Sequence, residues 1–287
     1  MTRCLVATLV VMLRMASSAI SGRNFARLTA AAIRCSRPLD LRGRRVELEE
    51  PLVLKGDDSL CVANGTVVGS GHAVFQAGGS RSGLLSLRNL NVLHLSSAAR
   101  LEKRALGAAI FARGKAQVRM EGCAISSTAG FGLWLVQKSH AVADACRFEA
   151  CGRSSVVAFE KTRFDLVDST IVDATPHGIC ARGDAAIRVV RSRIENADLR
   201  AIYCYHSVAL EVEDSAIFGT RSSESCAIQI DALRSVDAAT LVLSNTKFEG
   251  NAGGDLDVKG TVSRDVRCDN VVERSHDFAL RKGWADA

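Results

Sequence analysis

The sequence predicts an all-β fold, a single parallel β-helix of about nine rungs in which short strands stack as one coil. Three observations carry this prediction. Apolar positions recur every 23 residues through the middle of the chain. Within each repeat they alternate, as they do in a half-buried strand. A bend residue of nearly constant chemistry stands at a fixed place in each repeat.

The composition suits such a fold and limits the partners. The chain has 287 residues, of which 47% are hydrophobic and only 5% are aromatic, so Val, Ile, Leu and Ala must fill the core. The formal net charge of +6 comes from six arginines that precede the first carboxylate, Asp40. The remainder carries 31 basic and 31 acidic residues, so no basic excess points to a nucleic-acid partner.

The repeat is clearest in a short motif of a small residue, any residue, and then a branched residue or Phe. Four consecutive steps between these motifs, from Cys123 to Ser215, are 23 residues each. A period of this length is typical of a solenoid. The motif begins at Gly65, Leu90, Cys123, Cys146, Ser169, Ser192, Ser215 and Thr246.

Two alternating strands precede each motif, and the residues expected to point inward are all apolar. In the earlier strand they are Ile110/Ala112, Leu133/Leu135, Val156/Ala158, Ile179/Ala181 and Ile202/Cys204. In the later strand they are Val118/Met120, Phe164/Leu166, Ile187/Val189, Leu210/Val212 and Leu241/Leu243.

One position between the later strand and the motif marks a sharp bend. It holds Asn64, Asn89, Gly122, Ala145, Asp168, Arg191, Asp214 and Asn245. Six of these eight are Asn, Asp or Gly, which tolerate a left-handed backbone, so a left-handed bend is expected in every rung.

Stacking of rungs at about 4.8 Å would bring like positions together as ladders. Cys123 and Cys146 then occupy the same inward position on adjacent rungs. A ladder of reduced thiols is the expected state, because free cysteine packs as a small hydrophobe. A disulfide between the two is the alternative that the spacing of stacked strands allows.

The chain divides into four segments. Residues 1–22 are a possible targeting segment, residues 23–38 a capping helix, residues 39–260 the β-helix, and residues 261–287 a capping tail. Insertions interrupt the period at 96–106 and 233–240.

The apolar run at residues 4–13 is too short to span a membrane. A secretory signal, an organelle transit peptide and an ordinary start of the domain all remain open for it. The expected location is accordingly secreted or organellar, and otherwise cytoplasmic.

The segment GICARGDAAIRVVRSRIENA, residues 178–197, resembles the repeats of the pectin-lyase-like superfamily, in particular those of periplasmic NosD-type proteins and the F-box only protein 11 family. The opening segment, residues 51–71, resembles the first rung of polysaccharide-active members. The resemblance covers about residues 39–260 and implies a right-handed β-helix. It does not imply one activity, because the superfamily includes lyases, hydrolases, epimerases and non-catalytic modules.

The preferred function is a non-catalytic module, a monomer without cofactor or metal, that binds a polysaccharide or a protein partner. The outward positions of the first strand hold aromatic and arginine side chains where a solvated strand would be polar. The predicted ligand-binding residues are Phe111, Arg113, Trp134, Phe159, Arg182, Tyr203 and Tyr205.

The alternative is a polysaccharide lyase or glycoside hydrolase that acts on an acidic polysaccharide. Its candidate catalytic residues lie near the end of the stack: Asp231, Asp255, Asp257 and His206. Stacked carboxylates can serve as an acid/base pair, and a lyase of this kind would use Ca²⁺. Polygalacturonase-like motifs are represented only by residues 56–59 and 70–73, and the other two motifs are missing. Whether the chain is an enzyme stays open at this point.

Overall fold

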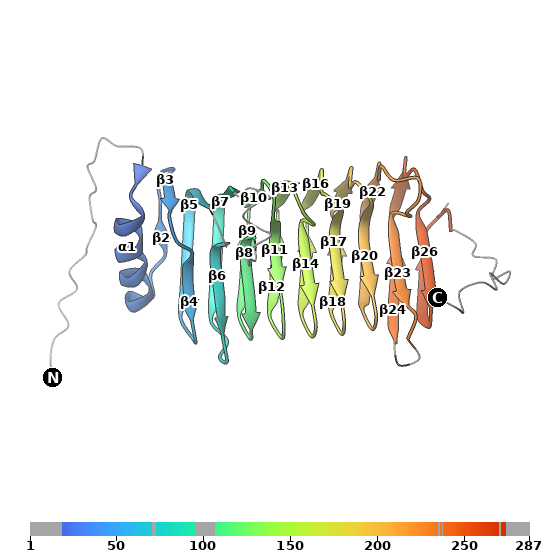
Figure 1. Cartoon of the computed structure of the whole chain (residues 1–287), viewed down its shortest axis with the longest axis horizontal. Helices are drawn as coiled ribbons and strands as arrows, with labels where there is room; N and C mark the ends of the chain where they lie inside the picture. The colour runs from blue at the N-terminus through green and yellow to red at the C-terminus, as the bar shows by residue number, and fades with distance from the viewer. Residues whose placement is uncertain are drawn as a thin grey trace, which may run out of the picture.

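The computed structural model describes residues 19–70, 73–95, 107–234, 236, 238–269 and 271–273. About nine turns stack along one axis as a parallel β-solenoid, with a single helix, α1 (Gly22–Cys35), at the N-terminal end (Figure 1). The predicted fold class is therefore confirmed. α1 is the one helix among the described residues, and it has 14 residues. No described helix is therefore long and apolar enough to cross a membrane.

Each turn contributes a strand to each of three parallel columns, and equivalent residues pair at the 23-residue spacing, as Leu133, Val156, Ile179 and Ile202 do. The first column is β4 (Leu52–Lys55), β6 (Ala73–Gly79), β8 (Ala108–Gly114), β11 (Phe131–Leu135), β14 (Val156–Phe159), β17 (His177–Arg182), β20 (Arg200–Tyr205), β23 (Ile228–Ala232) and β26 (Leu256–Gly260).

The other two columns share the long strands β5 (Ser59–Ser70) and β7 (Leu84–Leu95), which turn from one column into the next. The second column adds β2 (Leu39–Asp40), β9 (Gln117–Glu121), β12 (His140–Asp144), β15 (Arg163–Val167), β18 (Ala186–Val190), β21 (Ala209–Glu213), β24 (Ala239–Ser244) and β27 (Val262–Arg267). The third adds β1 (Ala19–Ile20), β3 (Arg45–Leu48), β10 (Ala124–Ser127), β13 (Arg147–Cys151), β16 (Thr170–Val172), β19 (Arg193–Glu195), β22 (Ala216–Phe218) and β25 (Lys247–Glu249).

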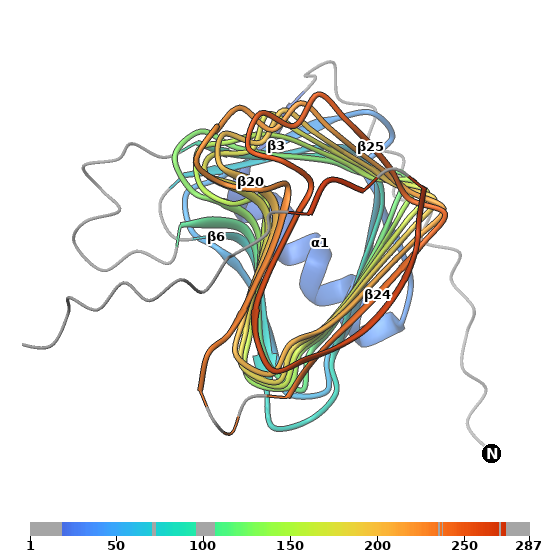
Figure 2. The ribbon, with the colours of Figure 1, turned by 90° about the vertical axis from the view of Figure 1, so that its right-hand side faces the viewer.

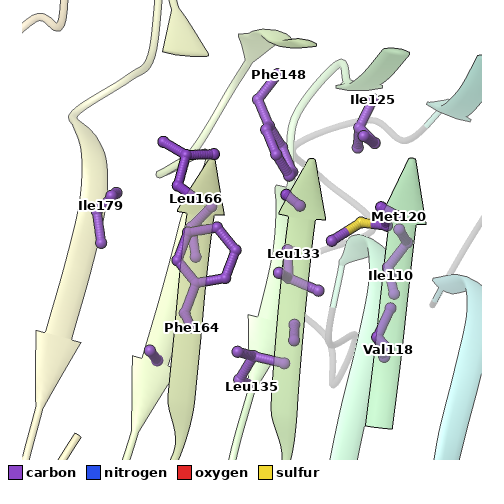
Figure 3. Close-up of a cluster of buried hydrophobic side chains, with 14 of the residues drawn as sticks. Ile110, Val118, Met120, Ile125, Leu133, Leu135, Phe148, Phe164, Leu166 and Ile179 are labelled. Carbon is purple, nitrogen blue, oxygen red and sulfur yellow. The ribbon is translucent and has the colours of Figure 1, made fainter. Parts of the chain in front are cut away.

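The core runs the length of the coil and consists of the alternating apolar residues that the sequence predicts to point inward. All twenty of these residues, in the first and second columns, are buried. Figure 3 shows the side chains of adjoining turns meeting inside the coil, among them Leu133, Phe148 and Phe164. A single rung cannot bury its own apolar side chains, because they are covered only by the rungs on either side. The stack of rungs is therefore the unit that folds.

The bend between the second and third columns is left-handed in every rung where the sequence predicts it. All eight residues have φ between 44° and 61°, including Ala145 and Arg191, which do not favour this conformation. Some of these residues bind the equivalent residue of the next rung. The guanidinium of Arg191, for example, donates to both oxygens of Asp168, at 2.8 and 2.7 Å.

The two other corners of each rung also contain left-handed residues, which the sequence reading did not anticipate. Between the first and second columns these are Gly114, Gln137, Glu160, Gly183 and His206. Between the third and first columns they are Ala150, Asp173, Asn196, Gly219 and Gly250. The view along the axis in Figure 2 shows the turns superposed as one closed coil with α1 lying across its end.

A ladder of small polar side chains stabilises the second-to-third bend from inside. The hydroxyl of Ser192 accepts from the backbone N–H of Ser169 at 3.1 Å and donates to the carbonyl of Val190 at 2.8 Å. Ser169 and Ser215 make the equivalent bonds on neighbouring rungs. On the next rungs the thiols of Cys123 and Cys146 are free, and no disulfide joins them.

The N-terminal end of the stack is closed by α1. Its N-cap is Ser21, whose side chain accepts from the N–H of Asn24, and it ends at the left-handed Ser36. The helix buries Phe25 completely, against the first rungs. Strand edges at the end of a sheet would otherwise be open to pairing with another chain.

At the other end, β27 (Val262–Arg267) continues the second column beyond the boundary placed at residue 260. Residues 271–273 then lie along β26, where the N–H of Val272 donates to the carboxylate of Asp255 at 2.9 Å. Between β23 and β24 the chain leaves the repeat, as predicted for 233–240, and Leu233 and Val236 are exposed there. Residues 1–18, the insertion at 96–106 and residues 274–287 lie outside the described residues, so the targeting segment and that insertion remain predictions.

Candidate functional site

The residues predicted to bind a ligand lie on the outward positions of the first column, in two neighbouring rows. One row contains Phe111, Trp134, Val157, Cys180 and Tyr203, and the other contains Arg113, Val136, Phe159, Arg182 and Tyr205. The rows are not uniformly open. Phe111 and Val157 are only 4% and 2% exposed, whereas Trp134 and Tyr203 are partly exposed. The aromatic residues therefore form two separate patches rather than one ladder.

The first patch centres on Trp134. Its ring packs edge to face against Phe111 and Phe131, with ring centroids 5.7 and 5.1 Å apart. Arg153 lies over the Phe131 ring at 5.5 Å. The indole nitrogen of Trp134 is buried and has no hydrogen-bond partner, which costs free energy. Phe131 was missed from the sequence because it stands at the strand's first residue, outside the two alternating rows.

The second patch centres on two tyrosines. Tyr203 and Tyr205 lie two residues apart on one strand and so point to the same face, where their rings stack with centroids 5.2 Å apart. Arg200 lies over the Tyr203 ring at 4.6 Å, and Arg182 over the Tyr205 ring at 5.3 Å. A cation above an aromatic face is attracted by the ring's quadrupole. The patch is thus an ordered set of rings with positive charge at its edge.

Burial sets the ionisation of this patch. His177 lies 5.3 Å from the Tyr203 ring and is nearly buried, and its burial, followed by the charge of Arg200, lowers its pKa to about 4. Its Nδ1 has no hydrogen-bond partner. Burial and then the neighbouring charge of Asp231 raise the pKa of Tyr203 to about 12. Both groups are therefore uncharged at neutral pH, and Arg182 and Arg200 supply the positive charge.

Two of the acidic candidates for catalysis, Asp231 and Asp257, lie at the C-terminal side of the tyrosine patch. Asp231 accepts from the Tyr203 hydroxyl at 3.0 Å and from the side-chain amide of Gln229. Lys259 lies 3.8 Å from Asp231 and 3.1 Å from Asp257. The structure therefore brings these two carboxylates to one ammonium group, on the last two turns.

The third acidic candidate, Asp255, has a different environment. It is 7% exposed and accepts from the side chain of Asn251 at 3.0 Å and from the N–H of Val272. This carboxylate fastens the residues that follow the last rung, and the bonds to its two oxygens go to structural partners. His206 lies on the first-to-second corner, where its backbone N–H donates to the carbonyl of Asp231 at 3.0 Å and its ring packs on Tyr205 at 5.3 Å.

The candidate site holds no recognisable metal-binding set. Among the residues that the structure describes, no three His, Cys, Asp or Glu side chains are grouped so that they could hold a metal ion. The lyase alternative expects a Ca²⁺ ion, and a Ca²⁺ site uses six to eight oxygen ligands. The described residues near Asp231 and Asp257 do not provide a cluster of carboxylates for such a site.

Comparison with known proteins supports the fold and no particular activity. Residues 52–194 match the family model described as right handed beta helix region. The search of curated proteins and the search of solved structures each find no match. The matched segment spans β4 to β19 and therefore includes the Trp134 patch, while Tyr203 and Tyr205 lie just beyond it.

Proposed function

We propose that this right-handed β-helix protein is a non-catalytic binding module that holds a carbohydrate along the outer face of its first column. The observation that carries the proposal is the pair of aromatic patches, around Trp134 and Tyr203, on one face of a rigid stack. Partly exposed rings beside arginines are unusual on a solvated strand face.

The spacing of the patches supports an extended ligand. Trp134 and Tyr203 occupy the same row three rungs apart, which corresponds to about 14 Å along the axis. A short oligosaccharide lying parallel to the axis would reach both. Its rings would pack on the aromatic faces of the two patches.

The arginines favour a ligand that also carries acidic groups. Arg182 and Arg200 are held over the tyrosine rings by cation–π contacts, and Arg200 also donates to Gln229 at 2.6 Å. A guanidinium presents a planar set of donors that matches a carboxylate. A protein partner with an acidic, apolar surface is the other occupant that this chemistry admits, and the test below separates the two.

The enzymatic alternative has less support from the geometry. Of its three carboxylates, Asp255 is engaged with Asn251 and Val272, and the other two share Lys259. A lyase would release unsaturated uronates, so absorbance on a panel of polyuronates tests it directly. Activity that depends on Asp231 or Asp257 would replace the binding-module proposal.

Binding to an oligosaccharide panel tests the proposal. The variants Trp134→Ala and Tyr203→Ala are expected to lose affinity for the oligosaccharides that bind the wild type, with little change in melting temperature. Val236→Ala provides a control, because Val236 is an exposed apolar residue outside the face. Oligosaccharide binding that survives the loss of both aromatic residues would contradict the proposal, and so would a screen in which only proteins bind.

A further inference from the structure

A second surface, along the corner between the first and second columns, is a groove with basic walls. Its volume is about 1030 Å³, and it runs over five successive turns, from the one that contains β6 to the one that contains β17. Four basic and two acidic side chains line it: Arg113, Lys115, Lys138, Lys161, Glu160 and Asp184. Residues 40–287 carry equal numbers of basic and acidic residues. The excess of positive charge in the groove therefore arises because basic residues are concentrated there, and not from the overall composition.

The three lysines stand at the same place on three consecutive rungs. The N–H of Lys115 donates to the carbonyl of Gly79, that of Lys138 to Gly114, and that of Lys161 to Gln137, at 3.2, 3.0 and 2.9 Å. Each bond joins a corner to the rung before it. The lysines therefore form a column with the rung spacing of about 4.8 Å.

A column of like charges is unusual in this molecule. On the other faces, basic side chains lie beside carboxylates, as Arg191 does with Asp168, Arg188 with Glu211 and Arg193 with Glu195. In the groove, Lys161 lies 4.0 Å from Asp184, but Lys115 and Lys138 have no ion-pair partner among the residues that the structure describes. Stacked ammonium groups repel one another, and an anionic ligand would remove that cost.

We propose that the groove binds a sulfated polysaccharide lying along the axis of the coil, with its sulfate groups meeting Lys115, Lys138 and Lys161 in turn. The lysine column presents one positive charge per rung, at about 4.8 Å intervals, so it is matched by a polysaccharide that carries closely and regularly spaced sulfate groups. The groove adjoins the aromatic face at Arg113, but its three lysines lie on the corner, and the inference does not rest on the function proposed above.

The chemistry of the groove separates this ligand from other polyanions. Side chains on one side of an extended peptide repeat every 6.6–6.8 Å, about two residues, which is out of step with the rungs. No aromatic side chain lines the groove, so it offers no stacking platform for the bases of a single-stranded nucleic acid. The column consists of lysine alone, whose compact ammonium carries three rotatable donors and suits a tetrahedral sulfate better than a planar carboxylate.

The backbone of the corner is closely packed beneath the lysines. Gly114 has φ of 68°, and a Cβ at this position would collide with the carbonyl of Gly79. Glycine thus allows the two rungs to approach closely along the groove, and the three lysines that line it are exposed.

The test is direct binding of a heparin-derived octasaccharide to the full chain at low salt. The variant with both Lys115→Gln and Lys138→Gln should bind about tenfold more weakly, because exposed charge pairs contribute modestly and two are removed. Its melting temperature should be unchanged or slightly higher, because repulsion within the column is relieved. Lys247→Gln is the matched control, since Lys247 is an exposed lysine on the third column that pairs with Glu249 at 2.8 Å.

Further arms separate the alternatives. A neutral octasaccharide should not bind the groove, and an octagalacturonate or a single-stranded oligonucleotide of equal charge should bind more weakly than the sulfated chain. The inference is overturned if the double variant matches the wild type, if Lys247→Gln loses as much affinity, or if either competitor binds more tightly through the same lysines. Loss of heparin binding in Trp134→Ala, with the double lysine variant unchanged, would place this ligand on the aromatic face and overturn the groove, so a failure of the groove is distinguishable from a failure of the aromatic face.

Discussion

The hydroxyl of Tyr203 donates a 3.0 Å hydrogen bond to the Oδ2 atom of Asp231, which lies two positions beyond the paired residue on the next strand of the first column. This bond joins the tyrosine patch to the carboxylates near the end of the stack. It also means that Asp231, a candidate for catalysis, already serves as an acceptor for a neighbouring side chain.

The ionisation of Tyr203 should report this contact. The chain has two tyrosines, so Tyr205→Phe leaves Tyr203 as the single phenol to titrate. Its pKa should be about 12, because burial and the charge of Asp231 both disfavour the phenolate. Adding Asp231→Asn should lower that pKa, although burial should keep it above the ordinary value. An ultraviolet pH titration of both variants measures this, and equal midpoints would show that Asp231 does not act on Tyr203.

The serine ladder predicts which substitutions the bend tolerates. Ser192→Ala removes the acceptor for the N–H of Ser169 and should cost about 1–3 kcal/mol of unfolding free energy, because a buried donor is left unpaired. Ser192→Cys should cost less, since Cys146 fills the same position on another rung and donates to the carbonyl of Asp144. Chemical denaturation of the two variants gives the comparison. Equal losses would mean that the ladder's hydrogen bonds are unimportant.

The register of the stack predicts different outcomes for two deletions. Removal of 178–200 deletes one full period and joins His177 to Ala201, so every later residue keeps its place in its column. The protein should fold as a shorter stack. Removal of 178–189 alone displaces all later inward residues and should prevent folding. Circular dichroism and thermal melts of both proteins test this, and indistinguishable melts would refute the 23-residue register.

The buried His177 predicts a loss of stability in acid. Its pKa in the folded protein is about 4 because of burial and the charge of Arg200, against about 6.5 in the unfolded chain. The unfolded state thus takes up the proton first as the pH falls. The stabilisation is fully present above pH ~6.5 and is lost as the pH falls towards 4, by at most about 3 kcal/mol.

The comparison of wild type with His177→Asn isolates this effect. Unfolding free energies at several pH values should fall more steeply for the wild type between about pH 6.5 and 4. Parallel pH profiles for the two proteins would show that His177 titrates normally in the folded state.

The sequence predicted most of the fold because strand periodicity and the need for burial point to the same residues. The inward pairs such as Leu133 and Leu135 alternate strictly, and the second-to-third bend is rich in Asn and Asp. The other two corners were missed because several of their left-handed residues, such as Gln137 and Glu160, have no intrinsic preference for that conformation. Contacts between rungs impose it on them.

The candidate site was less predictable, because exposure depends on contacts that alternation does not encode. Phe111 and Val157 point outward by pattern and yet are buried. Asp255 appeared to belong with Asp257, but it binds the segment after the last rung. The lysine column is present in the sequence as Lys115, Lys138 and Lys161 at intervals of 23 residues, but corner residues do not alternate as strand residues do, so no pattern marks them as one surface.

The most direct test of the central claim uses Trp134 as its own reporter. The chain has two tryptophans, so Trp284→Phe leaves Trp134 as the single fluorescent indole. Titration of this variant with an oligosaccharide that binds the wild type should produce a saturable change in emission, with the same dissociation constant as an independent binding measurement. Binding of that oligosaccharide without any change in Trp134 emission would contradict the assignment of the first column's outer face as the binding surface.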